Sequence, residues 1–120
     1  MSEDLPGARI VGDSGADGGP GAVWNLAPAE RSLDANVIWL PAGDGIDLHE
    51  GPDLDVLIHV LAGSGTLTID DGDIALATGM LAWLPPRSRR AFAAGPDGLR
   101  YLTVHQRKSR PAFGLRAPSA

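Results

Sequence analysis

The sequence contains no cysteine, and this absence removes several kinds of chemistry. Disulfide bonds, thiolate nucleophiles and cysteine metal ligands are all excluded. No apolar stretch approaches the length needed to cross a bilayer, and residues 1–19 lack the apolar core of a secretory signal peptide. Because no address is present, we expect a cytoplasmic protein with no membrane partner.

Positive charge is also in short supply, with 10 basic residues against 15 acidic ones and a formal net charge of −5. This balance gives no long-range attraction to nucleic acid or to an anionic membrane, so neither is an expected partner. With 120 residues the chain fits one domain and has no room for a second independent core.

Long helical patterns are missing too, because glycine and proline interrupt every stretch of sufficient length. Short apolar runs separated by turn signals are present instead, a pattern typical of an all-β sandwich or closed barrel. The runs cover residues 22–26, 35–41, 55–62, 66–69, 74–77, 80–85, 90–93 and 99–105. The Asp71-Gly72 pair suits a tight hairpin turn, and residues 29–36 offer a turn or so of helix at most.

We expect three segments along the chain. Residues 1–20 are rich in glycine, aspartate and serine and predict a flexible arm, residues 21–107 form the β-barrel, and residues 108–120 form a basic tail. Phe113 and Leu115 in the tail pack either onto a neighbour or onto the barrel, unless the tail is solvated.

Two stretches share a distinctive spacing of glycine, histidine and proline. In the first, Gly43 precedes His49 by five intervening residues, and Gly63 closes the stretch. In the second, Gly79 precedes Pro85 by five intervening residues. This spacing resembles the two signature motifs of the cupin superfamily, over most of the chain between arm and tail.

The resemblance implies an all-β jelly-roll barrel of two antiparallel sheets closing around one cavity, with little or no helix. The motif glycines fall at the ends of apolar runs, where a tight barrel needs positive φ or close backbone approach. Cupins often pair through edge strands or swapped termini, so we also expect a homodimer.

The metal ligands of the family are largely missing. The family uses two histidines one residue apart, a carboxylate and a third histidine around one divalent metal. His49 matches the first histidine, but Gly51 and Arg90 stand at the other two, and the carboxylate position is Val56 or, with a shorter spacer, Asp55. A cation at Arg90 would oppose a metal by like charge. We therefore predict no cofactor, with a divalent transition metal (Fe, Mn, Ni or Zn) as the alternative.

Asp55 and His59 share one face of a predicted strand. In one register, Val56, Ile58 and Val60 point inward as an apolar wall and leave Asp55 and His59 outside. In the other register Asp55 and His59 face the cavity, where an unpaired polar group costs about 1–3 kcal/mol. The first register is favoured unless the cavity is functional.

Several other side chains are candidates for the cavity. His49 is either a cavity-wall histidine or a metal ligand, and His105 either completes a pair with it or lies on the surface. Trp83, in the strand of the second motif, is the tryptophan that we expect to line the cavity. The candidate metal ligands are His49, Asp55, His59 and His105.

The arginines Arg87, Arg89 and Arg90 form a cluster in the second motif. One interpretation is a solvated loop that forms ion pairs with nearby carboxylates. The other is that Arg90 projects into the barrel mouth, where its fork of donors suits a carboxylate or phosphate. The cavity would then bind an organic anion without metal.

Three functions remain open from the sequence. The leading one is a small-molecule binding protein whose ligand contacts His49, Arg90 and Trp83. The alternatives are a metal-dependent enzyme of the dioxygenase or isomerase kind and a non-catalytic interaction module, and no catalytic residue is assigned. The fold alone does not choose among them.

Overall fold

The computed structural model describes residues 7–108. Residues 1–6 and 109–120 lie outside the described part, and with them the predicted positions of Phe113 and Leu115. The strands are β1 (Gly21–Asn25), β2 (Leu33–Leu40), β3 (Gly45–Glu50), β4 (Val56–Ile69), β5 (Gly72–Ala77), β6 (Leu81–Leu84) and β7 (Arg89–Gln106). Within residues 7–108 no helix has the length and apolar character to span a membrane. The all-β prediction is confirmed, and residues 29–36 contain part of one hydrogen-bonded turn and no helix.

β4 and β7 are much longer than the strands predicted from the sequence. Runs 55–62 and 66–69 belong to one strand, as do runs 90–93 and 99–105. Gly63 lies inside β4, where the strand bends, and not at the end of a strand. The bend needs glycine, because φ is 78° and a Cβ there would lie 2.0 Å from the carbonyl oxygen of Gly98. The β4–β7 ladder shifts register at this bend. β3 is absent from the predicted runs because its apolar residues alternate with polar ones.

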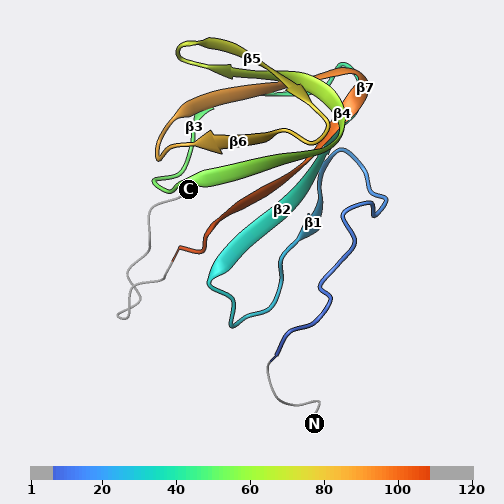
Figure 1. The fold of residues 1–120 in the computed structure, drawn as a ribbon, viewed down its shortest axis with the longest axis vertical. Helices are drawn as coiled ribbons and strands as arrows, with labels where there is room; N and C mark the ends of the chain where they lie inside the picture. The colour runs from blue at the N-terminus through green and yellow to red at the C-terminus, as the bar shows by residue number, and fades with distance from the viewer. Residues whose placement is uncertain (1–6, 109–120) are drawn as a thin grey trace.

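Opposite Gly63, residues 95–98 of β7 fall outside the ladder, and β7 bends there as well. The bends in β4 and β7 divide the strands into two antiparallel sheets. The second half of β7 pairs with β2 and with the first half of β4, and β1 and β6 extend this sheet at its two edges. The first half of β7 pairs with β3 and with the second half of β4, which in turn pairs with β5. Both long strands run to their bends on the right of Figure 1 and then return to the left. The inner faces of the two sheets therefore enclose the core.

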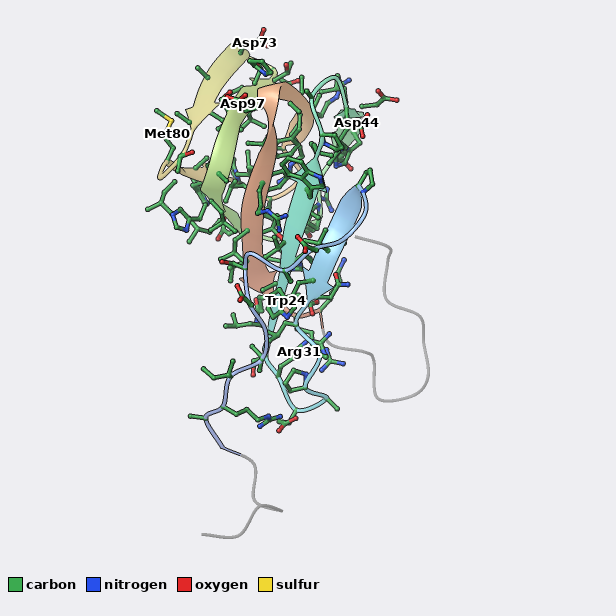
Figure 2. The ribbon with its side chains drawn as sticks, turned by 90° about the vertical axis from the view of Figure 1, so that its right-hand side faces the viewer. Trp24, Arg31, Asp44, Asp73, Met80 and Asp97 are labelled. Carbon is green, nitrogen blue, oxygen red and sulfur yellow. The ribbon has the colours of Figure 1, made fainter. Side chains whose placement is uncertain are left out.

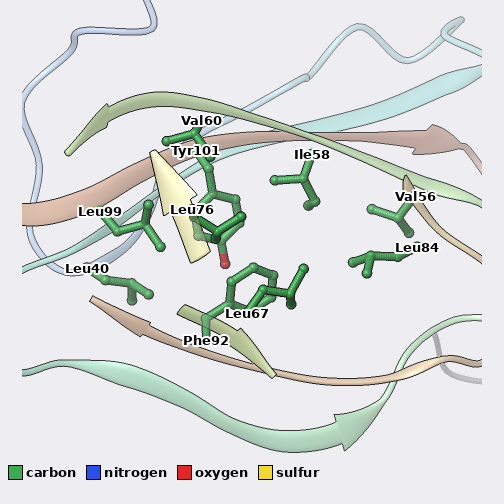
Figure 3. Packing of buried hydrophobic residues seen from close by; sticks show 10 residues of the cluster. All are labelled: Leu40, Val56, Ile58, Val60, Leu67, Leu76, Leu84, Phe92, Leu99 and Tyr101. Atoms are coloured by element: carbon green, nitrogen blue, oxygen red, sulfur yellow. The ribbon is translucent and has the colours of Figure 1, made fainter. Parts of the chain in front are cut away.

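The core confirms the register with the apolar wall inward. Val56, Ile58 and Val60 are 6%, 1% and 1% exposed. Figure 3 shows them with side chains from both sheets, including Phe92 and Tyr101, whose rings stack with centroids 4.8 Å apart. The core cluster consists of Leu40, Val56, Ile58, Val60, Leu67, Leu76, Leu84, Phe92, Leu99 and Tyr101.

Part of the predicted arm contacts the barrel. The indole Nε1 of Trp24 on β1 donates a hydrogen bond to the carbonyl oxygen of Val11 at 2.8 Å. Arg100 on β7 donates to the carbonyl oxygens of Ser14 and Ala16 at 3.2 and 3.1 Å. Figure 2 shows the arm beside Trp24 at the edge of the first sheet. These bonds satisfy arm carbonyls without forming a strand.

Candidate ligand-binding cavity

A cavity of about 250 Å³ lies between the two sheets, where β3 ends and β4 begins. Its wall combines an apolar body with a few polar groups, as small-molecule sites do. The lining residues are Asn36, Ile38, Ile46, His49, Pro52, Val56, Ile58, Leu84, Arg90, Phe92, Tyr101, Thr103 and His105. The cavity thus brings together three residues from the sequence analysis, namely His49, Arg90 and His105.

Arg90 is the most unusual residue in this wall. It is 3% exposed, and among residues 7–108 it is the one buried charged side chain. Neither Nη1 nor Nη2 has a hydrogen-bond partner in the described part of the chain. Burial lowers the pKa of Arg90, and a smaller electrostatic effect of Tyr101 raises it in part. Buried polar groups in folded proteins are nearly always paired, so a buried guanidinium without a partner calls for an explanation.

The alternation of β7 determines which arginine of the cluster points inward. Arg90 lies opposite His49 in the β3–β7 ladder, and Arg89 lies opposite Glu50 on the other face. Arg87, in the preceding turn, forms an exposed ion pair with Asp53 at 3.5 Å. Arg87 therefore lies in a solvated turn and forms an ion pair with a nearby carboxylate, whereas Arg90 lies in the cavity wall.

Two aromatic side chains form one side of the cavity. Tyr101 is 2% exposed and stacks on Phe92 with an angle of 12° between the ring planes. Burial raises the pKa of the Tyr101 hydroxyl well above its usual value, and the nearby Arg90 charge opposes this only in part. The phenol therefore stays neutral near pH 7 and is available as a hydrogen-bond donor.

His49 and His105 have similar local contacts. The Nδ1 of exposed His49 lies 2.8 Å from the carbonyl oxygen of Asp47, and the Nδ1 of half-buried His105 lies 2.9 Å from that of Gln106. A carbonyl oxygen only accepts, so Nδ1 carries the hydrogen in both rings. Each neutral imidazole then keeps Nε2 as an acceptor, and a protonated ring makes Nε2 a donor.

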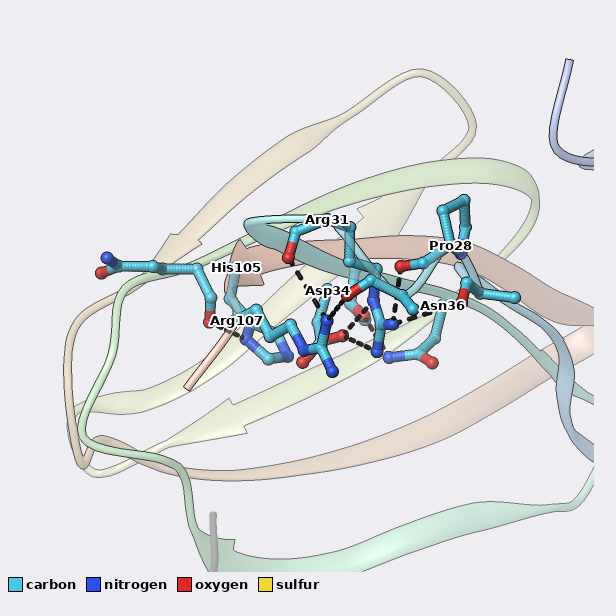
Figure 4. Close-up of polar contacts among 10 residues, drawn as sticks. Pro28, Arg31, Asp34, Asn36, His105 and Arg107 are labelled. Atoms are coloured by element: carbon cyan, nitrogen blue, oxygen red, sulfur yellow. Dashed lines mark hydrogen bonds and ion pairs between the residues drawn. The ribbon is translucent and has the colours of Figure 1, made fainter. Parts of the chain in front are cut away.

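Hydrogen bonds at the ends of β2 and β7 fix the polar side of the cavity (Figure 4). Asn36 donates to the Thr103 hydroxyl at 3.4 Å across this pair of strands. Arg31 donates to Asp34 at 2.8 Å, and Asp34 lies opposite His105 in the ladder. The position of His105 is thus set by a paired strand and not by a free loop.

Trp83 does not line this cavity, and the prediction that it does is wrong. Trp83 is 65% exposed, because its neighbours Ala82 and Leu84 take the inward positions of the short strand β6. Its indole Nε1 donates to the carboxylate of Asp55 at 3.0 Å on the outer surface. His59 is likewise on the face of β4 opposite to Ile58, so neither Asp55 nor His59 reaches the cavity.

The structure does not gather the four candidate metal ligands. His49 and His105 line the cavity together with Arg90, whereas Asp55 and His59 lie outside it. Over residues 7–108, no group of three or more histidine, aspartate and glutamate side chains is arranged to hold a metal ion. The donor set at this cavity is therefore one guanidinium, two imidazoles, a phenol, a hydroxyl and an amide.

Sequence reasoning missed Tyr101, Phe92, Thr103 and Asn36 as cavity residues. One signal was present, because Tyr101, Thr103 and His105 alternate along one strand and so share a face. That alternation does not say which face is inside, since both faces of this strand carry apolar residues. The pairing of β7 with β4 decides it.

Comparison with known proteins agrees with this architecture. The family described as the AraC-like ligand binding domain matches residues 37–116. A cupin protein from Bacteroides fragilis superimposes with a TM-score of 0.65 at 23% identity, over 87% of each chain. A cupin-2 domain containing protein from Shewanella frigidimarina gives a TM-score of 0.59 at 17% identity, over 70% of this chain and 78% of that one.

A conserved protein of unknown function from Streptococcus pyogenes is also similar, with a TM-score of 0.60 at 24% identity over 71% of this chain and 72% of that chain. No curated protein matches. The similar cupin structures agree with this chain in fold. Since the family match covers well over half of the sequence, the chain belongs to the AraC-like ligand binding domain family.

Proposed function

We propose that this protein binds a small organic anion in the barrel cavity, without a metal, through the guanidinium of Arg90. The observation that carries the proposal is that both terminal nitrogens of this buried side chain lack a hydrogen-bond partner. A bound carboxylate would supply two acceptor oxygens in the geometry of the guanidinium fork. Binding would then pair a charge that folding leaves unpaired.

The other polar groups of the cavity suit the same ligand. The neutral Tyr101 hydroxyl can donate to an anionic oxygen, and so can His49 or His105 when protonated. Among residues 7–108, no acidic side chain lines the cavity, so no carboxylate of this part of the chain competes for the guanidinium. These features favour an anion over a cation or a neutral sugar.

The apolar part of the wall limits the rest of the ligand. Ile38, Ile46, Ile58 and Phe92 contribute hydrocarbon surface to a cavity of about 250 Å³. Burial of apolar ligand surface against such a wall is favourable by about 25 cal/mol per Å². We therefore propose a compact monocarboxylate with an aromatic ring or a branched aliphatic body.

The family supports small-molecule binding in general, because it is described as a ligand binding domain. The identity of the ligand as a carboxylate is our proposal. The metal-dependent enzyme, the interaction module and the homodimer stay predictions. Metal content after soaking in Fe, Mn, Ni or Zn tests the first, and the mass of the assembly in solution tests the last.

Thermal unfolding with pairs of matched compounds tests the proposal. Benzoate, phenylacetate and 3-methylbutanoate are each compared with the corresponding uncharged amide. We expect at least one acid to raise the unfolding temperature while its amide does not, and Arg90→Met to abolish the shift. Arg89→Met is the matched control, because Arg89 is the exposed neighbour on the same strand.

The proposal fails if no acid in a wide panel of carboxylates and phosphates shifts the unfolding temperature. It also fails if the acids stabilise Arg90→Met as much as the unchanged chain. A shift by acid and amide alike would identify an apolar ligand and remove the role of the charge.

A further inference from the structure

Gly51 lies directly against the guanidinium of Arg90. A Cβ built on Gly51 would be 0.9 Å from Nη1, 2.2 Å from Cζ and 2.9 Å from Nη2 of Arg90. The guanidinium therefore occupies the space that any other residue at position 51 would fill with its own side chain.

The backbone does not require glycine at this position. Gly51 is not among the glycines with positive φ, whereas Gly43 and Gly79 are, at 88° and 92°. The following Pro52 favours an extended conformation at position 51, which alanine adopts as readily as glycine. The Gly51 N–H donates to the carbonyl oxygen of Ser88 at 3.0 Å, and alanine retains that N–H. The space taken by Arg90 is what excludes a side chain here.

We propose that Gly51 is a specificity-determining residue, which positions the anion-binding group by leaving room for it. This inference rests on the proposed function of Arg90. Gly51 and Arg90 act as one unit, because the first provides the space in which the second lies unpaired. A side chain at position 51 would drive the guanidinium out of its place and remove the anion preference of the cavity.

The clash at Gly51 falls on the flexible end of a long side chain and not on backbone atoms. Arginine has several rotatable bonds, so its end can move while the strands keep their ladder. Gly51→Ala should therefore fold, and its main effect should be on the position of Arg90. This separates a positioning role from a purely structural one.

A double-mutant cycle tests the inference with Gly51→Ala, Arg90→Met and the two combined. The first measurement needs no ligand. Phenylglyoxal modification followed by peptide mass spectrometry reports how accessible each arginine is. We expect Arg90 to react more slowly than Arg89 in the unchanged chain, because its terminal nitrogens are buried against Gly51, and at least tenfold faster in Gly51→Ala. The exposed Arg89 should react equally in both and serves as the internal control.

The second measurement is the affinity for whichever carboxylate of the panel stabilises the unchanged chain, such as benzoate. We expect Gly51→Ala to lose at least tenfold in affinity, and to have no further effect when Arg90 is already methionine. Equal modification of Arg90 with unchanged affinity would overturn the inference. If Gly51→Ala does not fold, the combined variant should, and its failure to fold would equally overturn the inference.

The two proposals fail in different ways. If Gly51→Ala exposes Arg90 but no anion binds the unchanged chain, the proposed function is wrong while the dependence of Arg90 on Gly51 holds. If anions bind but Gly51→Ala neither exposes Arg90 nor weakens binding, the role of Gly51 is wrong and the proposed function stands.

Discussion

The arginines at the rim of the barrel contrast with the arginine inside it. Arg31, Arg100 and Arg107 are all partly exposed, yet each donates to a carboxylate or to backbone carbonyls at 2.7–3.4 Å. Arg90 is far more buried and its terminal nitrogens have no such bond. Folding thus pairs these three partly exposed arginines and leaves the terminal nitrogens of the buried Arg90 without a partner among the described residues. That difference supports our proposal that the interior arginine binds a ligand, whereas the paired arginines have structural roles.

The largest expected effect is that of the ligand itself, which would complete the pairing of the interior arginine. At 100 times its dissociation constant, a carboxylate should add about 2.7 kcal/mol to the free energy of unfolding. Arg31→Met should keep this increment, since Arg31 is already paired with Asp34. Urea unfolding with and without benzoate measures it, and an equal loss in Arg31→Met and Arg90→Met would remove the contrast.

Removing the interior charge should stabilise the ligand-free protein. Methionine keeps most of the arginine stem but has no buried donors to satisfy, so Arg90→Met should raise the free energy of unfolding by about 1–3 kcal/mol. Urea unfolding without ligand measures the change. A decrease of similar size would mean that the guanidinium is satisfied in solution, and the interior would then resemble the rim.

The same substitution at the rim should act in the opposite direction. Arg31→Met loses the bonds to Asp34 and to the Pro28 carbonyl oxygen, so it should lower the free energy of unfolding by about 1 kcal/mol. Both variants remove one positive charge from the chain, which makes them matched. If Arg31→Met and Arg90→Met change the free energy of unfolding with the same sign, burial of the arginine does not determine its effect on stability.

A pH titration sharpens the account of the cavity wall. Burial raises the pKa of Tyr101, so the folded state resists ionisation of a group that the unfolded state ionises near pH 10. The contribution of the neutral Tyr101 hydroxyl to the free energy of unfolding is fully present below about pH 10 and falls as the pH rises further. The chain has one tyrosine, so tyrosinate absorbance reports Tyr101 alone.

We expect that absorbance to stay absent in the folded protein up to about pH 11 and to appear on unfolding. The control is the same titration in denaturant, which should give an ordinary tyrosine curve. Ionisation near pH 10 in the folded protein would mean that water reaches the phenol.

The smallest effect is expected on the outer surface. Trp83→Phe loses an exposed hydrogen bond to Asp55, so stability should change by about 0.5 kcal/mol or less. The affinity for an acid that binds the unchanged chain should not change, because Trp83 lies outside the cavity. A tenfold loss of affinity in Trp83→Phe would mean that Trp83 contacts the ligand after all.

Much of the fold was predictable from short-range patterns. Glycine and proline spacing indicated the barrel, and the period of two in residues 56–60 correctly placed the apolar wall. The continuity of β4 and β7 was not predictable, because glycine occurs both at a bend within a strand and at the end of a strand. Trp83 was misplaced because alternation in a strand of four residues does not indicate which face is inside.

The site was harder to predict than the fold. Arginine is rarely buried, so the sequence alone offers burial of Arg90 only as one of two interpretations. The link between Gly51 and Arg90 joins residues 39 positions apart, and no local pattern expresses it. The missing partner of the guanidinium is a property of three-dimensional packing, which only the structure shows.

The most direct test of the central claim is the difference in free energy of unfolding between Arg90→Met and the unchanged chain. It is measured without ligand and with a carboxylate at 1,000 times its dissociation constant, where binding adds about 4.1 kcal/mol. The account predicts that the sign of this difference inverts. Without ligand the variant is the more stable protein, and with ligand the unchanged chain is. A variant that is less stable under both conditions would contradict the claim that Arg90 is a buried charge kept for an anion.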